Sequence, residues 1–365
     1  MKKFVRLQCI VLLLIVVTAT FGYWVAVRNG FGSVSGDGDV RTGFWEYWSE
    51  ENPLDFPLFN STLLKLAEID ASEVRLRKEI EQLLERDVNN SKWISKEFKS
   101  TSSDWSRKKR FQPDIMEELL DQVKFPVDVH NSGLTGSKMK YSSCAVVGNN
   151  GILLNKEYGE LIDGHEAVIR LKNARIKSFE KNVGSKTTIS FISSPVLHHC
   201  ARNDDCFCHP YGTTVSIVLY MGQPAHFLDY VLCNSSHKSP LIVTDPRLDT
   251  LCYRIVKYYS LKRFADGRAN KTFEHWYSAH NGSMFVYSSG MQAATLALGI
   301  CDRVSLFGFG KSNGTKHHYH TNRTQELSVH DYAAEYDFYH DLVKKPHAVP
   351  FFSVSFKFPP MVIHN

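Results

Sequence analysis

The 365-residue sequence lacks a strong excess of charge of either sign. It has 43 Lys and Arg residues against 38 Asp and Glu residues, which gives a net charge of +5. Proteins that bind nucleic acid usually concentrate Lys and Arg on one face. The one dense basic cluster here is residues 107–110, which we interpret as a solvated surface. The charge pattern allows an anionic ligand but does not indicate a nucleic acid partner.

Acidic pairs that hold a divalent metal beside a nucleotide are also scarce. The single Asp-x-Asp segment, residues 37–39, lies in a Gly/Ser-rich stretch that is typical of a flexible linker. Two groups of residues superficially suggest zinc. The first group, His317, His318 and His320, lacks Cys or carboxylate partners at ligand spacing. In the second group the cysteines more often form disulfides in an oxidising compartment. The residues of this second group are His198, His199, Cys200, Cys206, Cys208 and His209. We therefore expect no metal and no other cofactor.

The N-terminus carries a candidate membrane anchor. Residues 1–6 are partly basic, and residues 7–27 are mostly apolar. About 20 apolar residues span the hydrocarbon core of a bilayer, and the basic residues place the short end in the cytoplasm. A cleaved signal peptide is the alternative, but the aromatic residues Phe21, Tyr23 and Trp24 favour an uncleaved anchor. This pattern predicts a single-pass type II membrane protein whose remainder lies in a lumen.

Glycosylation sequons and cysteines agree with a lumenal location. Asn-x-Ser/Thr sequons occur at Asn60, Asn89, Asn234, Asn270, Asn281, Asn313 and Asn322. The cysteines beyond the anchor, where disulfides can form, are Cys144, Cys200, Cys206, Cys208, Cys233, Cys252 and Cys301. Because their number is odd, we expect one thiol to be free or to pair with another chain.

The pattern divides the chain into a cytoplasmic tail (1–6), a signal-anchor (7–27), a lumenal stem (28–112) and a compact domain (113–365). Within the stem, residues 62–86 have a helical pattern with Leu76, Ile80 and Leu83 on one face. This helix either self-associates, which would give a homo- or hetero-oligomer, or packs on its own domain.

The compact domain shows alternating strand and helix patterns. Apolar runs predict strands at residues 143–147, 167–171, 215–221, 241–243 and 304–307, and helical patterns cover residues 152–162, 248–264 and 291–300. This alternation indicates one α/β, Rossmann-like doubly wound domain, whose ligand should bind at the carboxyl ends of the strands.

Two turns are candidates for that site. CAVVGNNG at residues 144–151 and YSSGMQ at residues 287–292 each run from an apolar segment through a small-residue turn into a helical pattern. The start of a helix presents unsatisfied N–H groups and partial positive charge to an anion. Asn149 and Asn150 add amide donors for a ribose or a phosphate. Two such turns suggest a site for the phosphate of a sugar donor.

Histidines follow the second turn. His318 lies in the segment KHHYHT at residues 316–321, and His330 lies in HDYAAE at residues 330–335. Imidazole titrates near neutral pH, so such a pair can supply a base and a partner for a phosphate.

The motifs in this order resemble those of the sialyltransferase family of animals and plants, and most closely its plant sialyltransferase-like members. The resemblance covers roughly residues 128–345. CAVVGNNG, the Ile162-Asp163 pair, IRLKNA and VGSKTT are similar to the family's long motif, and residues 287–310 to its short motif. His317-His318-Tyr319-His320 resembles the third motif. His330 with Glu335 fits the very short motif.

The resemblance implies a sialyltransferase-type variant of the glycosyltransferase A fold and an inverting, metal-independent sugar transfer in the Golgi. It implies that Asn149 contacts the donor nucleotide, and that Ser288, Ser289 and Gly290 bind the donor. His318 would hydrogen-bond the leaving phosphate, and His330 would deprotonate the acceptor hydroxyl. Cys144 and Cys301 would form a disulfide.

Two positions depart from the family's pattern. Lys172 stands where the long motif usually has Asn, with Asn173 beside it, and Tyr287 stands where the short motif usually has Pro. The leading hypothesis is transfer of sialic acid or a related acidic sugar from a CMP-sugar to glycoprotein or polysaccharide chains that end in galactose. The added cation of Lys172 keeps UDP-galactose open as the donor. A non-catalytic, glycan-binding or complex-stabilising Golgi protein is the third hypothesis.

Overall fold

The computed structural model describes residues 56–68, 104–105, 107–132, 139–200, 209–234, 237–266, 273–280, 285–311 and 314–365. All of them belong to one compact unit, Asp55–Asn365. The predicted tail and signal-anchor, residues 1–27, lie outside these residues. Across the ranges described, no helix combines the length and the apolar character that crossing a membrane requires.

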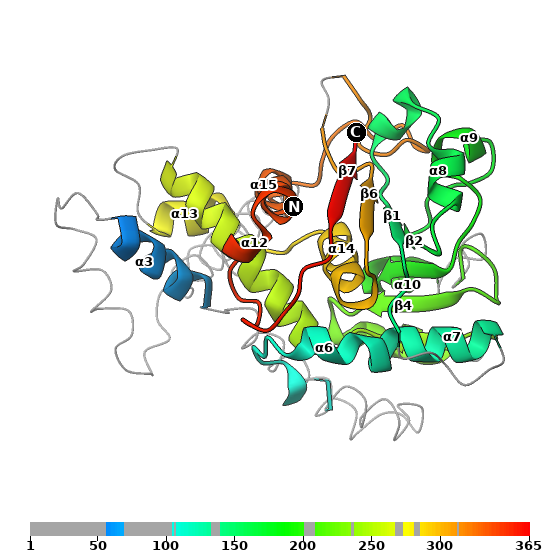
Figure 1. Cartoon of the computed structure of the whole chain (residues 1–365), viewed down its shortest axis with the longest axis horizontal. Helices are drawn as coiled ribbons and strands as arrows, with labels where there is room; N and C mark the ends of the chain where they lie inside the picture. The colour runs from blue at the N-terminus through cyan, green and yellow to red at the C-terminus, as the bar shows by residue number, and fades with distance from the viewer. Residues whose placement is uncertain are drawn as a thin grey trace, which may run out of the picture. The chain divides into compact units, whose positions relative to one another are not determined.

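One sheet of seven parallel strands organises this unit (Figure 1). Its strands are β1 (Cys144–Val147), β2 (Ala167–Leu171), β3 (Ile189–Ser193), β4 (Ser216–Tyr220), β5 (Leu241–Val243), β6 (Val304–Phe307) and β7 (Met361–His364). Their spatial order is β5-β4-β3-β2-β1-β6-β7. The chain therefore winds outward from β1 in one direction and returns to its other side with β6. In such a doubly wound sheet the ligand site is expected where the direction reverses, between β1 and β6.

Helices connect the strands. Those before the sheet are α3 (Phe56–Glu68), α6 (Ile115–Leu119), the π-helix η1 (Leu120–Lys124) and α7 (Phe125–Ser132). Those between strands are η2 (Gly151–Asn155), α8 (Gly159–Asp163), α9 (Glu180–Val183), α10 (Ser194–Cys200), η3 (Pro224–His226), α11 (Phe227–Asn234), α12 (Pro246–Asp266), α13 (Phe273–Ala279), α14 (Ser289–Ile300), α15 (Tyr332–Lys344) and η5 (Pro346–Ala348).

The helix α14 is the central element of the core. All of its residues are buried, and it contacts β1, β2, β3 and β6. Small side chains such as Ala293, Ala294 and Ala297 allow this close approach. Ala145 and Val147 of β1 belong instead to a cluster with Leu153 and Ile162, because side chains alternate between the two faces of a strand.

The predicted alternation of strands and helices is confirmed, with differences in detail. The helix expected at residues 152–162 is interrupted, and forms η2 and then α8. The break brings Gly159 against the backbone of α9, where a Cβ would lie 2.2 Å from the Glu180 carbonyl oxygen. The strands β3 and β7 and the helix α15 were not predicted. Serines interrupt the apolar run of β3, and β7 has only four residues.

The described part of the predicted stem packs on the same compact unit. Leu63, Leu66 and Ala67 of α3 are buried, and α3 contacts α12. Lys109 is also buried and forms an ion pair with Asp249 of α12 at 3.2 Å. Residues 62–68, the part of the predicted stem helix that the structure describes, therefore pack on their own domain. Residues 69–86 lie outside the described residues, and the boundary at residue 113 stays a prediction.

The structure describes some of the predicted cysteines and glycosylation sequons and not others. Cys144 at the start of β1 and Cys301 at the end of α14 form a disulfide between residues 157 apart in the chain. Cys233 is also disulfide-bonded, and Cys252 is a fully buried free thiol. Cys200 ends α10, but Cys206 and Cys208 lie outside the described residues, as do the sequons at Asn89, Asn270, Asn281 and Asn313. Asn60, Asn234 and Asn322 are described, and their glycosylation stays a prediction.

Candidate active site

The two predicted turns meet in one pocket at the carboxyl ends of the central strands. Gly148 directly follows β1, Lys172 follows β2 and Gly308 follows β6. The other lining residues come from both turns, from the His segment and from α15: Asn149, Asn150, Leu171, Ser288, Ser289, Gly290, Phe309, His317, His318, Tyr332, Glu335, Tyr336 and Tyr339. The pocket thus lies at the reversal between β1 and β6, where a doubly wound sheet binds its ligand.

The first turn is held tightly against its neighbours. A Cβ on Gly148 would lie 2.9 Å from the Gly308 carbonyl oxygen, so this position requires glycine. The Asn150 side chain accepts a hydrogen bond from Ile152 N at 3.0 Å and caps η2. In contrast, the buried side-chain oxygen of Asn149 has no hydrogen-bond partner within the part of the chain that the structure describes. A buried amide without a partner is destabilising, so Asn149 is the group in this turn that a ligand would satisfy.

The second turn begins α14. The Ser288 hydroxyl accepts from Met291 N at 3.3 Å and caps the helix. Ser288 N and Oγ donate to the Glu335 carboxylate at 2.7 and 2.5 Å. Burial raises the pKa of Glu335 to about 7, although hydrogen bonds from Ser288 and Tyr339 oppose the shift. Ser289 and Gly290 form the first turn of a twelve-residue helix, whose N–H groups and dipole favour an anion.

Lys172 brings a cation into the pocket. It follows β2 with a φ of 55°, in the left-handed region that few residues other than glycine adopt. Burial lowers the pKa of its amine, and the charge of Arg323 lowers it further while Glu335 opposes. Lys172 forms no salt bridge within 4.0 Å among the residues described. The amine of the half-buried Lys172 is therefore placed to pair with an anionic ligand.

Asn173, the neighbour of Lys172, does not reach the pocket. It is exposed and lines a separate cavity with Arg175, Lys177 and Tyr211. The left-handed turn at Lys172 separates the two side chains. The structure therefore places Lys172, and not Asn173, beside the other predicted site residues.

His318 lines the pocket beside His317, with the two ring centroids 4.5 Å apart. Burial lowers the pKa of His318 to about 3, and the charges of His317 and Lys172 contribute. Its imidazole is thus neutral at physiological pH and can donate one hydrogen bond. The next residue, Tyr319, donates from its backbone N to the Asn149 carbonyl at 2.8 Å, which fixes this segment against the first turn.

His330 lies outside the pocket lining, next to the segment that leads into the second turn. Its Nδ1 donates to the Val286 carbonyl oxygen at 2.9 Å, so the lone pair is on Nε2. Burial lowers the pKa of His330 to about 4; the hydrogen bond with Val286 opposes this, and the charge of Lys172 adds to it. A fixed neutral imidazole with one available basic nitrogen is the form that a general base needs.

A buried network of hydrogen bonds and an ion pair supports the second turn. The Tyr287 hydroxyl donates to Asp249 and accepts from Gln292 Nε2 at 2.8 Å. The Tyr287 ring stacks on Tyr220 with centroids 5.3 Å apart, and Lys109 neutralises Asp249. As whole residues, all of these except Tyr220 are at most 7% exposed. The network anchors Tyr287, the residue just before Ser288, to Asp249 of α12, and through Asp249 to Lys109.

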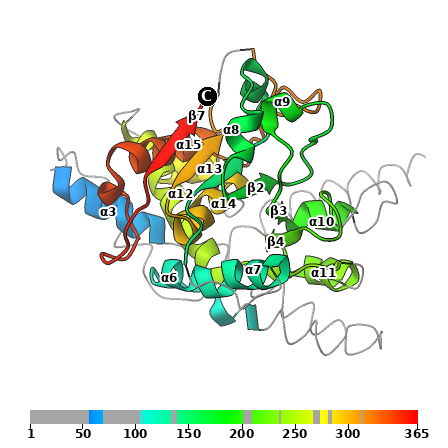
Figure 2. The same cartoon turned by 45° about the vertical axis from the view of Figure 1, so that its right-hand side comes forward.

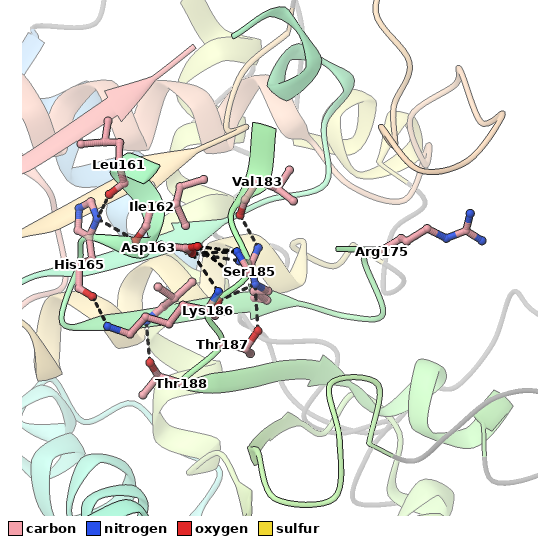
Figure 3. A network of polar contacts seen from close by, with 12 residues as sticks. Leu161, Ile162, Asp163, His165, Arg175, Val183, Ser185, Lys186, Thr187 and Thr188 are labelled. Carbon is pink, nitrogen blue, oxygen red and sulfur yellow. Dashed lines mark hydrogen bonds and ion pairs between the residues drawn. The ribbon is translucent and has the colours of Figure 1, made fainter. Parts of the chain in front are cut away.

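A second network shapes the end of β2. Figure 3 shows its part around Asp163, Ser185 and Lys186, and Arg170 of β2 belongs to the same network. The Asp163 carboxylate accepts from the backbone N of Ser185 and of Lys186 at 2.8 to 2.9 Å, and from the Ser185 hydroxyl at 2.9 Å. Arg170, which is 1% exposed, donates to the carbonyl oxygens of Val183 and Lys186 at 2.8 and 2.9 Å. These contacts hold the VGSKTT segment against β2, two residues before Lys172. Sequence reasoning did not assign Asp163, Arg170 or Tyr319 a role. Their signal was membership of the motif segments alone.

A doubly wound parallel sheet with a polar pocket at its reversal point is the arrangement that nucleotide-binding α/β enzymes use. The family model for glycosyltransferase family 29 (sialyltransferase) matches residues 83–347. The chain therefore belongs to glycosyltransferase family 29, and it is a glycosyltransferase.

Three known proteins illustrate how similar this chain is to its relatives in sequence. The chain is 47% identical to the beta-1,6-galactosyltransferase GALT29A of Arabidopsis thaliana over 347 residues, 84% of this chain and 87% of the relative. It is 42% identical to the sialyltransferase-like protein 1 of Oryza sativa subsp. japonica over 365 aligned residues, 86% of this chain and 90% of that protein. A mouse CMP-N-acetylneuraminate-beta-galactosamide-alpha-2,3-sialyltransferase 1 is 27% identical over 63% of this chain and 64% of its own length.

Among solved structures, a mammalian sialyltransferase matches 68% of this chain and 83% of its own chain, at 25% sequence identity and a TM-score of 0.37. That score is too low to establish a shared fold, and the glycosyltransferase A assignment stays an expectation.

Proposed function

We propose that the protein transfers galactose from UDP-galactose to a galactose-containing glycan, and that it does so in the Golgi lumen behind an N-terminal anchor. Lys172 is the observation that carries the choice of donor. Its amine lies in the pocket at a position where the family's motif usually has Asn, and an added cation favours a diphosphate over a monophosphate. The similarity to a galactosyltransferase at 47% identity supports the same donor.

The chemistry follows from the placement of the side chains. The donor phosphates would lie against the start of α14 and the Lys172 amine, with the nucleotide beside Asn149. Nε2 of His330 would take the proton of the acceptor hydroxyl as its oxygen attacks the anomeric carbon. The bond from that carbon to the phosphate oxygen then breaks, and UDP leaves with a hydrogen bond from His318. A single displacement inverts the anomeric centre. The transfer is proposed to need no metal, because Lys172 and the helix start supply the positive charge.

A CMP-linked acidic sugar is the second candidate donor. The four ordered motifs and the similarity to a mouse sialyltransferase favour it. The acceptor is the same in both proposals, a glycoprotein or polysaccharide chain that ends in galactose. Membership of a glycosyltransferase family favours both candidates over the non-catalytic hypothesis.

Ligand binding and turnover can separate the two donors. Full-length protein in detergent would be melted with UDP and with CMP, since a ligand at about 100 times its Kd stabilises the folded chain by about 2.7 kcal/mol. The same protein would be given UDP-galactose or a CMP-linked acidic sugar with a galactan acceptor. We expect a shift with UDP and transfer of galactose. A shift with CMP alone, accompanied by transfer of the acidic sugar, would overturn the choice of donor.

The proposed location has its own test. In sealed Golgi vesicles, an epitope at the C-terminus should be protected from added protease until detergent is present. Digestion of that epitope in intact vesicles would contradict the type II topology.

A further inference from the structure

A second cluster of metal-binding side chains lies away from the donor pocket, where β3 and β4 end. The helix α10 begins directly after β3, and α11 follows β4 through η3. The two helices lie side by side (Figure 2). They bring together His198, His226 and Asp229, and one potential ligand atom from each lies within 4.8 Å of the others. None of the three lines the donor pocket.

The carboxylate of this cluster is completely buried. Asp229 has no exposed surface, and its Oδ2 lies 2.7 Å from Nδ1 of His198. A carboxylate buried in this way is a strong ligand for a divalent ion, because the ion's charge offsets the cost of burial, and neutral imidazole is the form in which histidine binds a metal.

The second imidazole is oriented by a contact typical of metal sites. His226 is 5% exposed, and its ring centroid lies 4.4 Å from that of His198. Its Nδ1 lies 2.9 Å from the Ser194 hydroxyl oxygen, and that oxygen accepts a hydrogen bond from Gly222 N at 3.0 Å. Hydrogen bonding at one ring nitrogen holds the ring of a metal-binding histidine in place, so Nε2 is the nitrogen that we assign to the ion.

We propose that His198, His226 and Asp229 bind a zinc ion that ties α10 to α11. Two imidazole nitrogens and one carboxylate oxygen are a ligand set that zinc takes. Zinc–ligand bonds of about 2.0–2.2 Å place neighbouring ligand atoms about 3–4 Å apart, so the ion would replace the direct contact between His198 and Asp229. The His198 side chain is 40% exposed, which leaves a solvent side for water as the fourth ligand. The ion is structural, and the proposed sugar transfer does not use it.

This ligand set differs from the zinc alternative that the sequence offers. That alternative joins His198 to nearby cysteines, whereas the structure joins it to two residues of a later segment, and Asp229 is 31 residues away. Cys233, further along α11, is engaged in a disulfide.

Zinc binding can be measured without any sugar donor. Full-length protein in detergent would be stripped with EDTA, transferred to metal-free buffer and titrated with Zn²⁺ by calorimetry, with bound metal counted by mass spectrometry. We expect about one Zn²⁺ per chain and a higher Tm with the metal. His226→Gln and Asp229→Asn should lose both effects, and His347→Gln, at an exposed histidine outside the cluster, should keep both.

Replacement of the buried Asp229 can prevent folding, so His198→Gln is measured as well because that side chain is partly exposed. A folded His198→Gln protein that binds Zn²⁺ at least tenfold more weakly than wild type supports the site. Wild-type protein that retains no more Zn²⁺ than the folded His198→Gln protein, with no shift in Tm, would overturn it.

Discussion

Ser288 and Glu335, 47 residues apart in the chain, are joined by two hydrogen bonds from the serine N and Oγ to the two carboxylate oxygens. Ser288 caps α14, and Glu335 lies in the first turn of α15. Both residues line the pocket, and Glu335 is 1% exposed. These two hydrogen bonds therefore fix the shape of the second turn, and the buried carboxylate is part of the site.

This contact predicts a pH dependence of stability. Burial raises the pKa of Glu335 from 4.5 to about 7 in the folded chain. A carboxyl with a raised folded pKa contributes most stability below its unfolded pKa, and this contribution is lost as the pH rises through about 7. We expect the free energy of unfolding to lose about 3 kcal/mol from this group between pH 4.5 and 7.5.

Glu335→Gln, which cannot ionise, should remove that loss. Denaturant unfolding at several pH values measures the slope for each variant. The control is Glu157→Gln, because that carboxylate makes only an exposed ion pair at 4.0 Å and should keep the wild-type slope. Equal slopes for wild type and Glu335→Gln would show that the prediction is wrong.

His330→Gln should remove the proposed base. We expect kcat to fall by about 10²–10⁴-fold, with the KM for the donor little changed, since general base catalysis contributes about that much. The burial that lowers the pKa of His330 to about 4 predicts an acid limb in kcat/KM of the wild type near that pH. Below it the imidazole is protonated and cannot act as a base. Steady-state kinetics across pH measure both effects, and a kcat within threefold of wild type would exclude His330 as the base.

Lys172→Asn restores the residue that the family's motif usually has. Removal of a charge-assisted hydrogen bond to phosphate should weaken binding by about 1.5–3 kcal/mol, which is a rise of about 10–150-fold in the KM for UDP-galactose. The matched control is Lys177→Asn, at an exposed lysine that lines the neighbouring cavity. If both variants keep the wild-type KM, Lys172 does not contact the donor phosphates.

Tyr287→Phe tests whether the buried network of Tyr287, Asp249 and Gln292 positions the second turn. Loss of the hydroxyl removes one buried hydrogen bond from Asp249 and one from Gln292, and we expect about 1–3 kcal/mol of lost stability. If the network positions Ser288, the KM for the donor should rise severalfold while the KM for the acceptor stays unchanged. Tyr277→Phe, at a residue 40% exposed, is the control. A loss of stability with both KM values unchanged would give Tyr287 a purely structural role.

Local sequence patterns predicted much of the fold because they depend on neighbouring residues. The runs at residues 144–147, 167–171 and 304–307 are mostly apolar, with one polar residue at most in each, as is typical of buried parallel strands. The β3 strand was not predicted because two of its five residues are serines, which weakens that pattern. The helix expected at residues 152–162 failed because its break is imposed by α9, a contact that no local pattern contains.

The candidate site was predicted in outline for the same reason. Gly148, Asn149, Ser288 and His318 each belong to a motif of a few neighbouring residues that can be read from the sequence. The structure brings these four residues into one pocket. Asn173 shares a motif with Lys172, but the backbone turn at φ 55° directs it elsewhere. Motif membership does not determine side-chain direction.

By itself the sequence determined the α/β alternation, the two small-residue turns and the histidines that follow them, since hydrophobic period and turn chemistry are local properties. Only the tertiary structure decided which of these residues share a pocket, that Glu335 holds Ser288, and that Tyr287 depends on Asp249 and Lys109. Those relationships join residues far apart in the chain, and burial and charge at such contacts arise only when the sheet and its helices pack together.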